Sequence, residues 1–343
     1  MEEIIIMNYL EKVYKKTIET GSLDLGSGKG MDIWQWDEGV VMYGLIKAYE
    51  KTKDKEILVF IKKWINYHLD KMDFGFSINT TAPLLGVLKL LECGEKDERY
   101  EKVCRDFANW CLSECARADR GTFEHTCTVN KYDNQIWADT LFMGCIFLIK
   151  WGLFIDNDMY IREATRQFVL HYQFLSDDET NLIYHGYDCN ERSQKGVLWG
   201  RGNGWFTVAS VEALNLLPKN TIYYDEIKAN FLKHFESIIK YQNENGSWNT
   251  VINKPDTYAE MSVTSAFAYG IHKAVDLGVV DKKYDKAYVL ALKALKSDID
   301  VDGKVLHGSL GTCVMEDYKK YNDIKCGYSY FTQGLAMMAL SCE

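Results

Sequence analysis

Residues 138–152, ADTLFMGCIFLIKWG, would present apolar side chains on every side of a helix. After Asp139 the next charged residue is Lys150, so such a helix would lack a polar, solvent-exposed face. A helix that is hydrophobic all round is buried inside a larger protein. Five other stretches have nearly the same character and open on small or polar residues: 38–52, 79–92, 202–217, 260–278 and 332–341. We therefore expect six buried helices.

Helical segments of a second kind, each with one charged and one apolar face, alternate strictly with the buried set. They cover residues 4–19, 56–71, 100–115, 159–175, 224–242 and 284–299. A two-helix unit that repeats in this way cannot bury its apolar face alone. The pattern predicts an all-α fold, the (α/α)6 barrel or six-hairpin toroid, and an open superhelical stack is the alternative. The runs LIYHGYD (182–188) and KVLHGSL (304–310) are expected to form short hairpin arms.

The overall composition excludes several classes of partner. The chain has 343 residues and a net charge of −9, and no cluster of Lys and Arg stands out. Nucleic acids and anionic membrane surfaces require such clusters, so we expect neither as a partner. No apolar stretch reaches the ~20 residues that a membrane span needs. Because the chain has only three prolines and no flexible linker, residues 1–343 are expected to form a single domain.

The ten cysteines are expected to be reduced thiols. Residues 1–7 contain two glutamates and a brief isoleucine run, a pattern that does not match a signal peptide. We therefore expect a cytoplasmic protein, where thiols stay reduced. The sequence has no C-x-x-C pair, so no zinc or other metal site is expected.

A glycine-rich run, LDLGSGKG (23–30), resembles the loop of a nucleotide or S-adenosylmethionine pocket. Such loops bind their ligand when a strand precedes them and a helix follows. Here a helical pattern precedes the run, and two tryptophans and three acids follow it in DIWQWDEG (32–39). We interpret the run as a loop between two helices; a methyltransferase is the alternative.

The inner helices of the predicted barrel would all run the same way, so their N-termini would gather at one end. The segments around these N-termini combine aromatic and hydrogen-bonding residues: WQWDEG (34–39), FSINTTAP (76–83), DNQIWADT (133–140), VLWGRGNGW (197–205), YAEMSVTS (258–265) and YSYFTQG (328–334). Aromatic rings also fill protein cores. Six such clusters at one end favour a carbohydrate pocket, since sugar C–H faces pack on aromatic rings while the hydroxyls form hydrogen bonds.

Three of these segments carry a resemblance to a known family. NQIWADTLFMG (134–144), YHG (184–186) and WGRGNGW (199–205) resemble the unsaturated rhamnogalacturonyl hydrolases of glycoside hydrolase family 105, and more distantly the unsaturated glucuronyl hydrolases of family 88. The resemblance implies the (α/α)6 barrel and makes Asp139 the acid/base. It places eight further residues in the sugar site: Tyr43, Asn79, His125, Trp137, His185, Trp199, Arg201 and Trp205. The family often has a second aspartate where this chain has Asn79.

The resemblance implies a small anionic oligosaccharide substrate and no metal or organic cofactor. An acid protonates C4 of a C4=C5 double bond in a terminal uronate, water adds at C5, and the resulting hemiketal falls apart. The expected substrate is an unsaturated galacturonyl–rhamnose disaccharide. An unsaturated glucuronyl hydrolase acting on glycosaminoglycan fragments is one alternative. A non-catalytic sugar-binding barrel is another.

The roles of single residues are less constrained by the sequence. Burial would raise the pKa of Asp139, whereas a nearby helix N-terminus would lower it, and Asp139 could instead be a simple helix cap. Arg201 is expected to bind the uronate carboxylate through two parallel hydrogen bonds, with a surface or capping arginine as the alternative. His185 would hydrogen-bond a hydroxyl or orient the water, or be purely structural.

Overall fold

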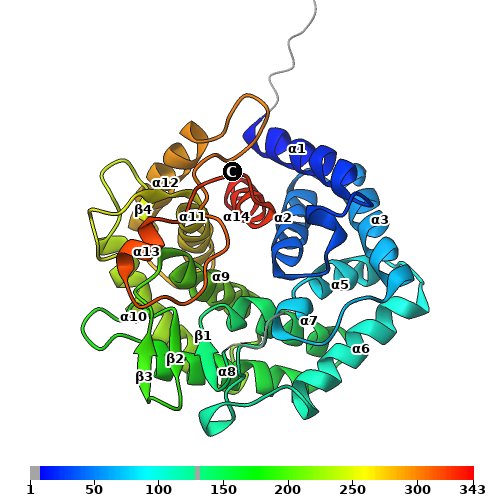
Figure 1. Ribbon diagram of the computed structural model, residues 1–343, viewed down its shortest axis with the longest axis horizontal. Helices are drawn as coiled ribbons and strands as arrows, with labels where there is room; N and C mark the ends of the chain where they lie inside the picture. The colour runs from blue at the N-terminus through cyan, green and yellow to red at the C-terminus, as the bar shows by residue number, and fades with distance from the viewer. Residues whose placement is uncertain (1–7, 128–131) are drawn as a thin grey trace, which may run out of the picture.

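The computed structural model describes residues 8–127 and 132–343 and consists of helical hairpins arranged in a ring (Figure 1). The outer helices are α1 (Tyr9–Asp24), α3 (Lys55–Lys71), α6 (Glu98–Ser113), α8 (Asp158–Leu175), α10 (Tyr224–Lys240) and α12 (Asp285–Ser297). The inner positions are taken by α2 (Trp36–Thr52), α4 (Ile78–Thr81) with α5 (Leu84–Glu92), η3 (Leu141–Cys145) with α7 (Ile146–Phe154), α9 (Gly200–Leu216), α11 (Met261–Asp276) and α14 (Tyr330–Leu340). This is the (α/α)6 barrel predicted from the alternation of apolar and amphipathic segments.

Local sequence explains where most outer helices begin. Asn8, Asp54, Asp97 and Asn157 each precede an outer helix and accept a hydrogen bond from a backbone N–H of its first turn. Such N-caps satisfy N–H groups that have no partner within the helix. The predicted start of the first outer helix falls in residues 4–7, which lie outside the described residues.

Two inner helices differ from their predicted form. The stretch predicted as a helix over 79–92 contains Pro83, and the structure divides it into α4 and α5 there. The stretch predicted over 138–152 begins as a helix only at Leu141, with the π-helical turn η3. Turns of this kind are often found at functional sites.

The ring closes where the first inner helix, α2, packs against the last, α14 (Figure 1). Two glycines face each other at this crossing: a Cβ atom on Gly44 would lie only 2.3 Å from the backbone oxygen of Gly334. The backbones therefore approach as closely as two helices can. This contact closes the toroid and excludes the open superhelical stack.

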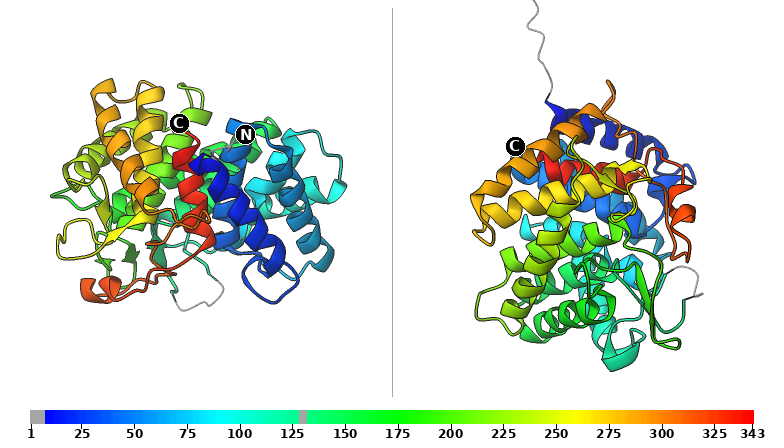
Figure 2. Two further views of the ribbon diagram at one scale, coloured as in Figure 1. Left: turned by 90° about the horizontal axis from the view of Figure 1, so that it is seen from above. Right: turned by 90° about the vertical axis from the view of Figure 1, so that its left-hand side faces the viewer.

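Several short strands lie at one end of the barrel. Strands β1 (Gln135–Trp137), β2 (Gly186–Asp188) and β3 (Ser193–Lys195) form an antiparallel sheet, and β4 (Trp248–Asn249) pairs with β5 (Ala259–Glu260). The arm predicted at 182–188 therefore contains a strand, whereas the run 304–310 takes part only in isolated bridges. From the side, the long connection from α12 to α14, orange to red in Figure 2, runs across one end of the barrel.

The glycine-rich run forms the predicted loop between helices, with α1 before it and the short 3-10 helix η1 (Gly30–Asp32) after it. The backbone N–H groups of Gly26 and Gly28 donate to the carboxylate of Asp32. The amides that would bind a phosphate or a methionine carboxylate are therefore used by the chain itself. The methyltransferase alternative is wrong for this reason.

Among the described residues, no helix is long and apolar enough to cross a membrane.

The closure of the ring generates a test. Gly44→Ala should lower the free energy of unfolding by about 2 kcal/mol, because overpacking a tight contact costs more than the gain of up to about 1 kcal/mol from replacing a helical glycine. Gly144→Ala is the matched control on an inner helix, since its Cβ would meet Ile78 at an ordinary 3.6 Å. Urea unfolding measures both; equal midpoints for Gly44→Ala and wild type would contradict the closure argument.

Candidate active site

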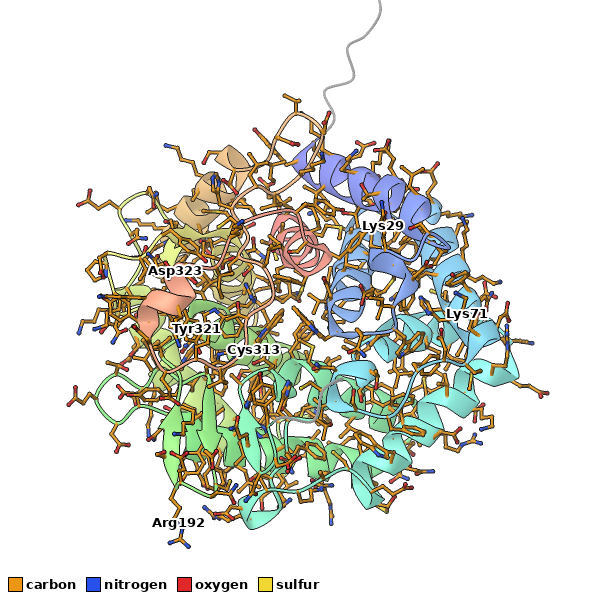
Figure 3. The ribbon with its side chains drawn as sticks, in the orientation of Figure 1. Lys29, Lys71, Arg192, Cys313, Tyr321 and Asp323 are labelled. Carbon is orange, nitrogen blue, oxygen red and sulfur yellow. The ribbon has the colours of Figure 1, made fainter. Side chains whose placement is uncertain are left out.

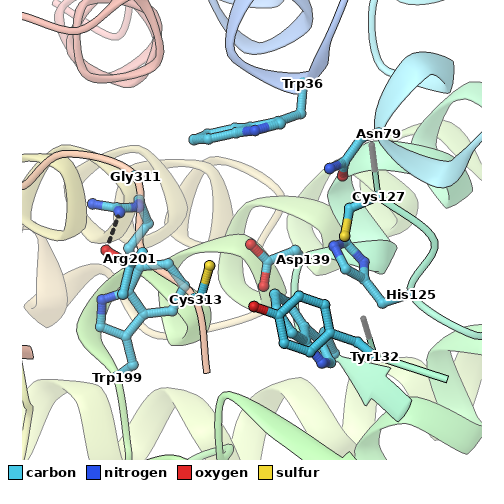
Figure 4. Close-up of a pocket in the computed structure, with 12 residues that line it drawn as sticks. Trp36, Asn79, His125, Cys127, Tyr132, Asp139, Trp199, Arg201, Gly311 and Cys313 are labelled. Atoms are coloured by element: carbon cyan, nitrogen blue, oxygen red, sulfur yellow. Dashed lines mark hydrogen bonds between the residues drawn. The ribbon is translucent and has the colours of Figure 1, made fainter. Parts of the chain in front are cut away.

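A cavity of about 350 Å³ opens where the N-termini of several inner helices meet (Figure 4). This volume suits one small ligand. Its walls are formed by Trp36, Asn79, His125, Cys127, Tyr132, Trp137, Asp139, Trp199, Arg201, Gly311, Thr312 and Cys313. Six of the nine residues predicted from the sequence are among them: Asn79, His125, Trp137, Asp139, Trp199 and Arg201. The structure brings them together from four separate segments of the chain.

The register of the small sheet positions Asp139. Trp137 at the end of β1 pairs with Gly186 of β2, and the N–H of Ala138 donates to the backbone oxygen of His185 over 3.1 Å. Asp139 therefore lies beside His185, with 3.6 Å between its Oδ2 atom and the Nε2 atom of the histidine. Neither atom has a hydrogen-bond partner, so both are available to a ligand or to each other.

Burial decides the protonation of Asp139. It raises the pKa of this carboxyl group from 3.8 to about 7. The positive charge of Arg201 and the nearby indole N–H of Trp205 act in the opposite direction and lower this pKa. The helix N-terminus at Leu141, which would lower the pKa of Asp139, does not outweigh the effect of burial. Near neutral pH a substantial fraction of Asp139 is thus protonated, which a general acid requires.

Arg201 is buried beneath the 309–312 segment, with only 1% of its surface exposed. Its Nη1 donates to Ser309 and Ser262, and its Nη2 donates to the oxygen of Leu310 and the hydroxyl of Thr312. These acceptors use every terminal N–H of the guanidinium, while the Nε hydrogen has no partner. The expected two-bond contact with a carboxylate is therefore not open unless the 309–312 segment moves.

Two aromatic rings and a buried carboxyl group surround the guanidinium of Arg201. The guanidinium lies between the rings of Trp199, 4.4 Å from its centroid, and Phe331, 4.6 Å away. Oε1 of Glu260, itself buried, lies 3.8 Å from Nη1. Arg201 is consequently neither a surface arginine nor a helix cap.

Two histidines flank Trp137 and are neutral. His125 stacks on the Trp137 ring at 4.7 Å and contacts the Thr140 hydroxyl at 3.0 Å. Burial lowers the pKa of His125 to about 3 and holds the pKa of His185 well below its usual value. His185 packs behind the cavity wall, with its ring 4.2 Å from that of Trp199.

The structure does not bring Tyr43 to the cavity, which corrects the sequence prediction. Tyr43 lies seven residues into α2, about 10 Å along the helix from its start. Its hydroxyl donates to the buried carboxylate of Glu212, which also binds Tyr269 and Lys47. Tyr43 thus helps to fill the barrel axis beneath the site.

Trp205 was also predicted to line the sugar site. The structure buries it completely behind the cavity wall, with its ring 5.1 Å from that of Phe142.

The sequence prediction omitted six lining residues: Trp36, Cys127, Tyr132, Gly311, Thr312 and Cys313. Trp36 belongs to the aromatic cluster WQWDEG, and that signal could have identified it. Residues 311–313 belong to the long connection between α12 and α14, which has no periodic pattern. Their position follows from the hydrogen bonds to Arg201 and could not be inferred from the sequence.

The cavity contains few carboxylates. Asp139 is the only Asp or Glu among the lining residues that the structure describes, and the amide side chain of Asn79 lines the same cavity. Within the described residues, no group of three or more His, Cys, Asp and Glu side chains could hold a metal ion. The site can supply one buried acid, aromatic walls and a fixed positive charge.

Comparison with known proteins gives consistent matches over the whole chain. The family model described as Glycosyl Hydrolase Family 88 matches residues 9–342. The unsaturated rhamnogalacturonyl hydrolase YesR of Bacillus subtilis is 28% identical over 345 residues, covering 99% of this chain and 95% of YesR. A crystal structure from Salmonella enterica, described as a possible member of the GH105 family, has a TM-score of 0.91 and 30% identity and covers 100% of this chain and 95% of that one. A similarly described structure from Klebsiella pneumoniae has a TM-score of 0.90 and 28% identity, covering 100% and 94%.

The raised pKa of Asp139 predicts a pH-dependent cost to stability. A group whose pKa is higher in the folded state stabilises the fold below its unfolded pKa, and this contribution is lost as the pH rises through the folded value, about 7 here. Asp139→Asn should therefore be more stable than wild type at pH 8, by on the order of 4 kcal/mol, and equal to it within about 1 kcal/mol at pH 4. Thermal unfolding across this range measures the difference. Exposed Asp133, changed to Asn, should show no such trend; a difference for Asp139→Asn that does not vary with pH would contradict the assignment.

Proposed function

Because the chain belongs to glycosyl hydrolase family 88, we propose that it removes a 4,5-unsaturated galacturonyl residue from the non-reducing end of rhamnogalacturonan-derived oligosaccharides. The family resemblance expected from the sequence is confirmed, and the chain is a glycoside hydrolase. The substrate is proposed from the name of the relative YesR, an unsaturated rhamnogalacturonyl hydrolase that matches nearly the whole chain.

The observation that carries the proposal is a single acid, 15% exposed and with a pKa of about 7, in a cavity lined by aromatic residues. Ordinary glycosidases use two carboxyl groups, one as acid and one as base or nucleophile. The described lining residues offer Asp139 alone, with Asn79 where a second carboxylate would be expected. Hydration of an enol ether requires one group that first donates a proton and then accepts one.

In the first step, the carboxyl group of Asp139 donates its proton to C4 of the unsaturated uronate. The electrons of the C4=C5 bond form the new C4–H bond, and the positive charge that develops at C5 is shared with the ring oxygen. Asp139 becomes a carboxylate, which the charge of Arg201 favours. The general acid contributes about 10²- to 10⁴-fold to the rate of such a step.

In the second step, water adds to C5 and the carboxylate of Asp139 takes the proton that the water releases. The product is a hemiketal at C5. Its bond from C5 to the ring oxygen breaks, giving a C5 ketone and a hydroxyl at C1. The bond from C1 to the partner sugar then breaks, which releases that sugar and a 4-deoxy-5-keto uronate, with one water consumed overall.

The walls of the cavity supply the groups that bind a sugar. The rings of Trp36, Trp137 and Trp199 provide flat apolar surfaces for C–H faces, and the amide of Asn79 offers both a donor and an acceptor. The buried charge of Arg201 favours an anionic ligand, and its free Nε hydrogen can donate one hydrogen bond. We assign the uronate to the part of the cavity next to Arg201 and Asp139.

We also propose that residues 1–343 act as one domain in the cytoplasm. One continuous apolar core joins inner and outer helices from α1 to α14. Cys104, Cys111 and Cys145 are buried free thiols, as expected where thiols stay reduced.

The test follows the ultraviolet absorbance of the conjugated double bond, which disappears when the uronate is hydrated. Wild type should consume an unsaturated galacturonyl–rhamnose disaccharide, and Asp139→Asn should lower kcat by about 10²- to 10⁴-fold. Asp133→Asn, the same change at an exposed position six residues earlier, should retain full activity.

The same assay separates the alternatives. Turnover of unsaturated glycosaminoglycan disaccharides alone would overturn the assigned substrate and favour a glucuronyl hydrolase. If the ultraviolet absorbance of every unsaturated disaccharide stays unchanged while the protein still binds the sugar, the result would favour a sugar-binding barrel without catalysis.

The pKa of Asp139 also predicts the pH profile. The acid must be protonated at the start of the reaction, so kcat/KM should fall tenfold per pH unit above about pH 7. With an ordinary carboxyl pKa of 3.8, the fall would begin about three units lower. A profile that keeps rising from pH 7 to pH 9 would show that Asp139 is not the proton donor.

A further inference from the structure

His185 has a second partner on the side away from Asp139. Its Nδ1 atom lies 2.8 Å from the hydroxyl oxygen of Tyr321, a residue 136 positions away in the sequence. Tyr321 is fully buried and belongs to the short helix α13 (Tyr318–Asn322), on the connection that also carries Cys313 (both labelled in Figure 3). Neither the sequence patterns nor the cavity walls assign it a role.

The hydrogen bonds around Tyr321 fix the direction of its O–H group. The backbone N–H of Met315 donates to the Tyr321 oxygen over 3.2 Å. The phenol hydrogen must point to an acceptor, and the Nδ1 atom of His185 is the acceptor within reach. A nitrogen that accepts a hydrogen bond carries no hydrogen of its own.

This hydrogen count determines the tautomer of His185. Burial, together with His125 and Arg201, holds the pKa of His185 well below 6.5, so its ring is neutral and has one hydrogen. With Nδ1 accepting from Tyr321, that hydrogen is on Nε2. Nε2 faces the Oδ2 atom of Asp139 at 3.6 Å, and neither atom has another partner.

We propose that Tyr321 is a positioning residue that holds His185 in the tautomer whose Nε2–H faces Asp139. The inference rests on the proposed function of Asp139 as the proton donor. As Asp139 gives up its proton, the Nε2–H becomes a donor to the new carboxylate. In the other tautomer a lone pair would face that carboxylate and oppose the proton transfer. The present 3.6 Å separation is compatible with this role, because catalytic hydrogen bonds often tighten only when substrate binds.

The fold holds Tyr321 firmly in this position. Gly196, with φ +77°, lies so close that a Cβ there would be 2.6 Å from the Tyr321 hydroxyl, and the missing side chain makes room for it. On α13 itself, the side chain of Asn322 accepts a hydrogen bond of 2.9 Å from the backbone N–H of Tyr258, and Asp317 caps the N-terminus of the helix. These contacts keep the Tyr321 hydroxyl next to Nδ1 of His185.

Few other charged or titratable groups act on this pair. Arg201 of α9 lowers the pKa of Asp139, and Arg201 and His125 both act on His185. Burial raises the pKa of Tyr321 above that of a free phenol, so its hydroxyl is protonated near neutral pH. Its effect on Asp139 is therefore transmitted through the histidine tautomer.

The first experiment compares Tyr321→Phe with wild type on the unsaturated disaccharide. We expect kcat to fall about tenfold, the value of one hydrogen bond to a charged group, with KM unchanged within twofold. The basic limb of the kcat/KM profile should move to higher pH, because the carboxylate of Asp139 loses a donor. Tyr318→Phe is the matched control, since it removes a hydroxyl from the same helix that reaches only Asp256 at the surface.

The second experiment does not depend on turnover. Nitrogen-15 NMR of the imidazole rings distinguishes the two tautomers, and comparison with His185→Gln identifies the His185 signals among the seven histidines. Wild type should show Nε2–H, and Tyr321→Phe should show a mixture of tautomers.

The outcomes separate this inference from the proposed function. A wild-type signal from Nδ1–H overturns the role of Tyr321, whether or not Tyr321→Phe folds. An unchanged kcat and pH profile for Tyr321→Phe also overturns it. If wild type turns over no unsaturated disaccharide, the proposed function fails, while the tautomer measurement still tests the effect of Tyr321 on His185.

Discussion

The site exists because each outer helix returns the chain, so that successive inner helices run in the same direction. Trp36, Asn79, Asp139 and Arg201 each lie at or just before the start of an inner helix, and they meet in one cavity. Helix N-termini carry partial positive charge, so their convergence favours an anionic ligand. The arrangement depends on closure between α2 and α14, where Gly44 and Gly334 let two backbones meet. Larger side chains would open the ring and separate the walls.

The electrostatics of this end are compatible with the proposed anionic ligand, although the chain has a net charge of −9. Burial raises the pKa of Asp37 to about 7, against the N–H of Phe331 and the Arg201 charge, and raises the pKa of Glu38 well above its usual value. A substantial fraction of Asp37 and Asp139 is therefore protonated near neutral pH, and burial favours the neutral form of Glu38. At the other end of the axis Glu212 stays ionised: burial opposes its charge, but Lys47 and two tyrosine hydroxyls lower its pKa. The ionised carboxylate of Glu212 therefore lies away from the cavity.

The fold could be predicted from the sequence because burial imposes a visible pattern. Helices that are apolar all round must be internal, and their alternation with amphipathic segments gives the order of the ring. The site residues at the inner N-termini were predicted from the family resemblance of the motifs that carry them, together with the clustering of aromatic and polar residues at these helix starts. Tyr43 was misplaced because it lies two turns below the site. The 311–313 wall and Tyr321 could not be predicted: they lie on a long connection without periodicity, held by contacts from Arg201 and His185 that arise only after folding.

The state of Arg201 bears on how the anionic ligand is held. Its terminal nitrogens already donate to Ser262, Ser309, Leu310 and Thr312. A carboxylate that displaced the buried acceptors Ser262 and Ser309 would leave them unpaired, which costs about 1–3 kcal/mol each. A guanidinium fixed in this way needs no reorganisation during the reaction. In the proposed reaction it would act as a stationary charge, with one free Nε hydrogen, that favours an anion nearby and stabilises the carboxylate of Asp139 after proton transfer. On this account, Arg201 and the Nε2–H of His185 stabilise the same carboxylate, one through its charge and the other through a directed hydrogen bond.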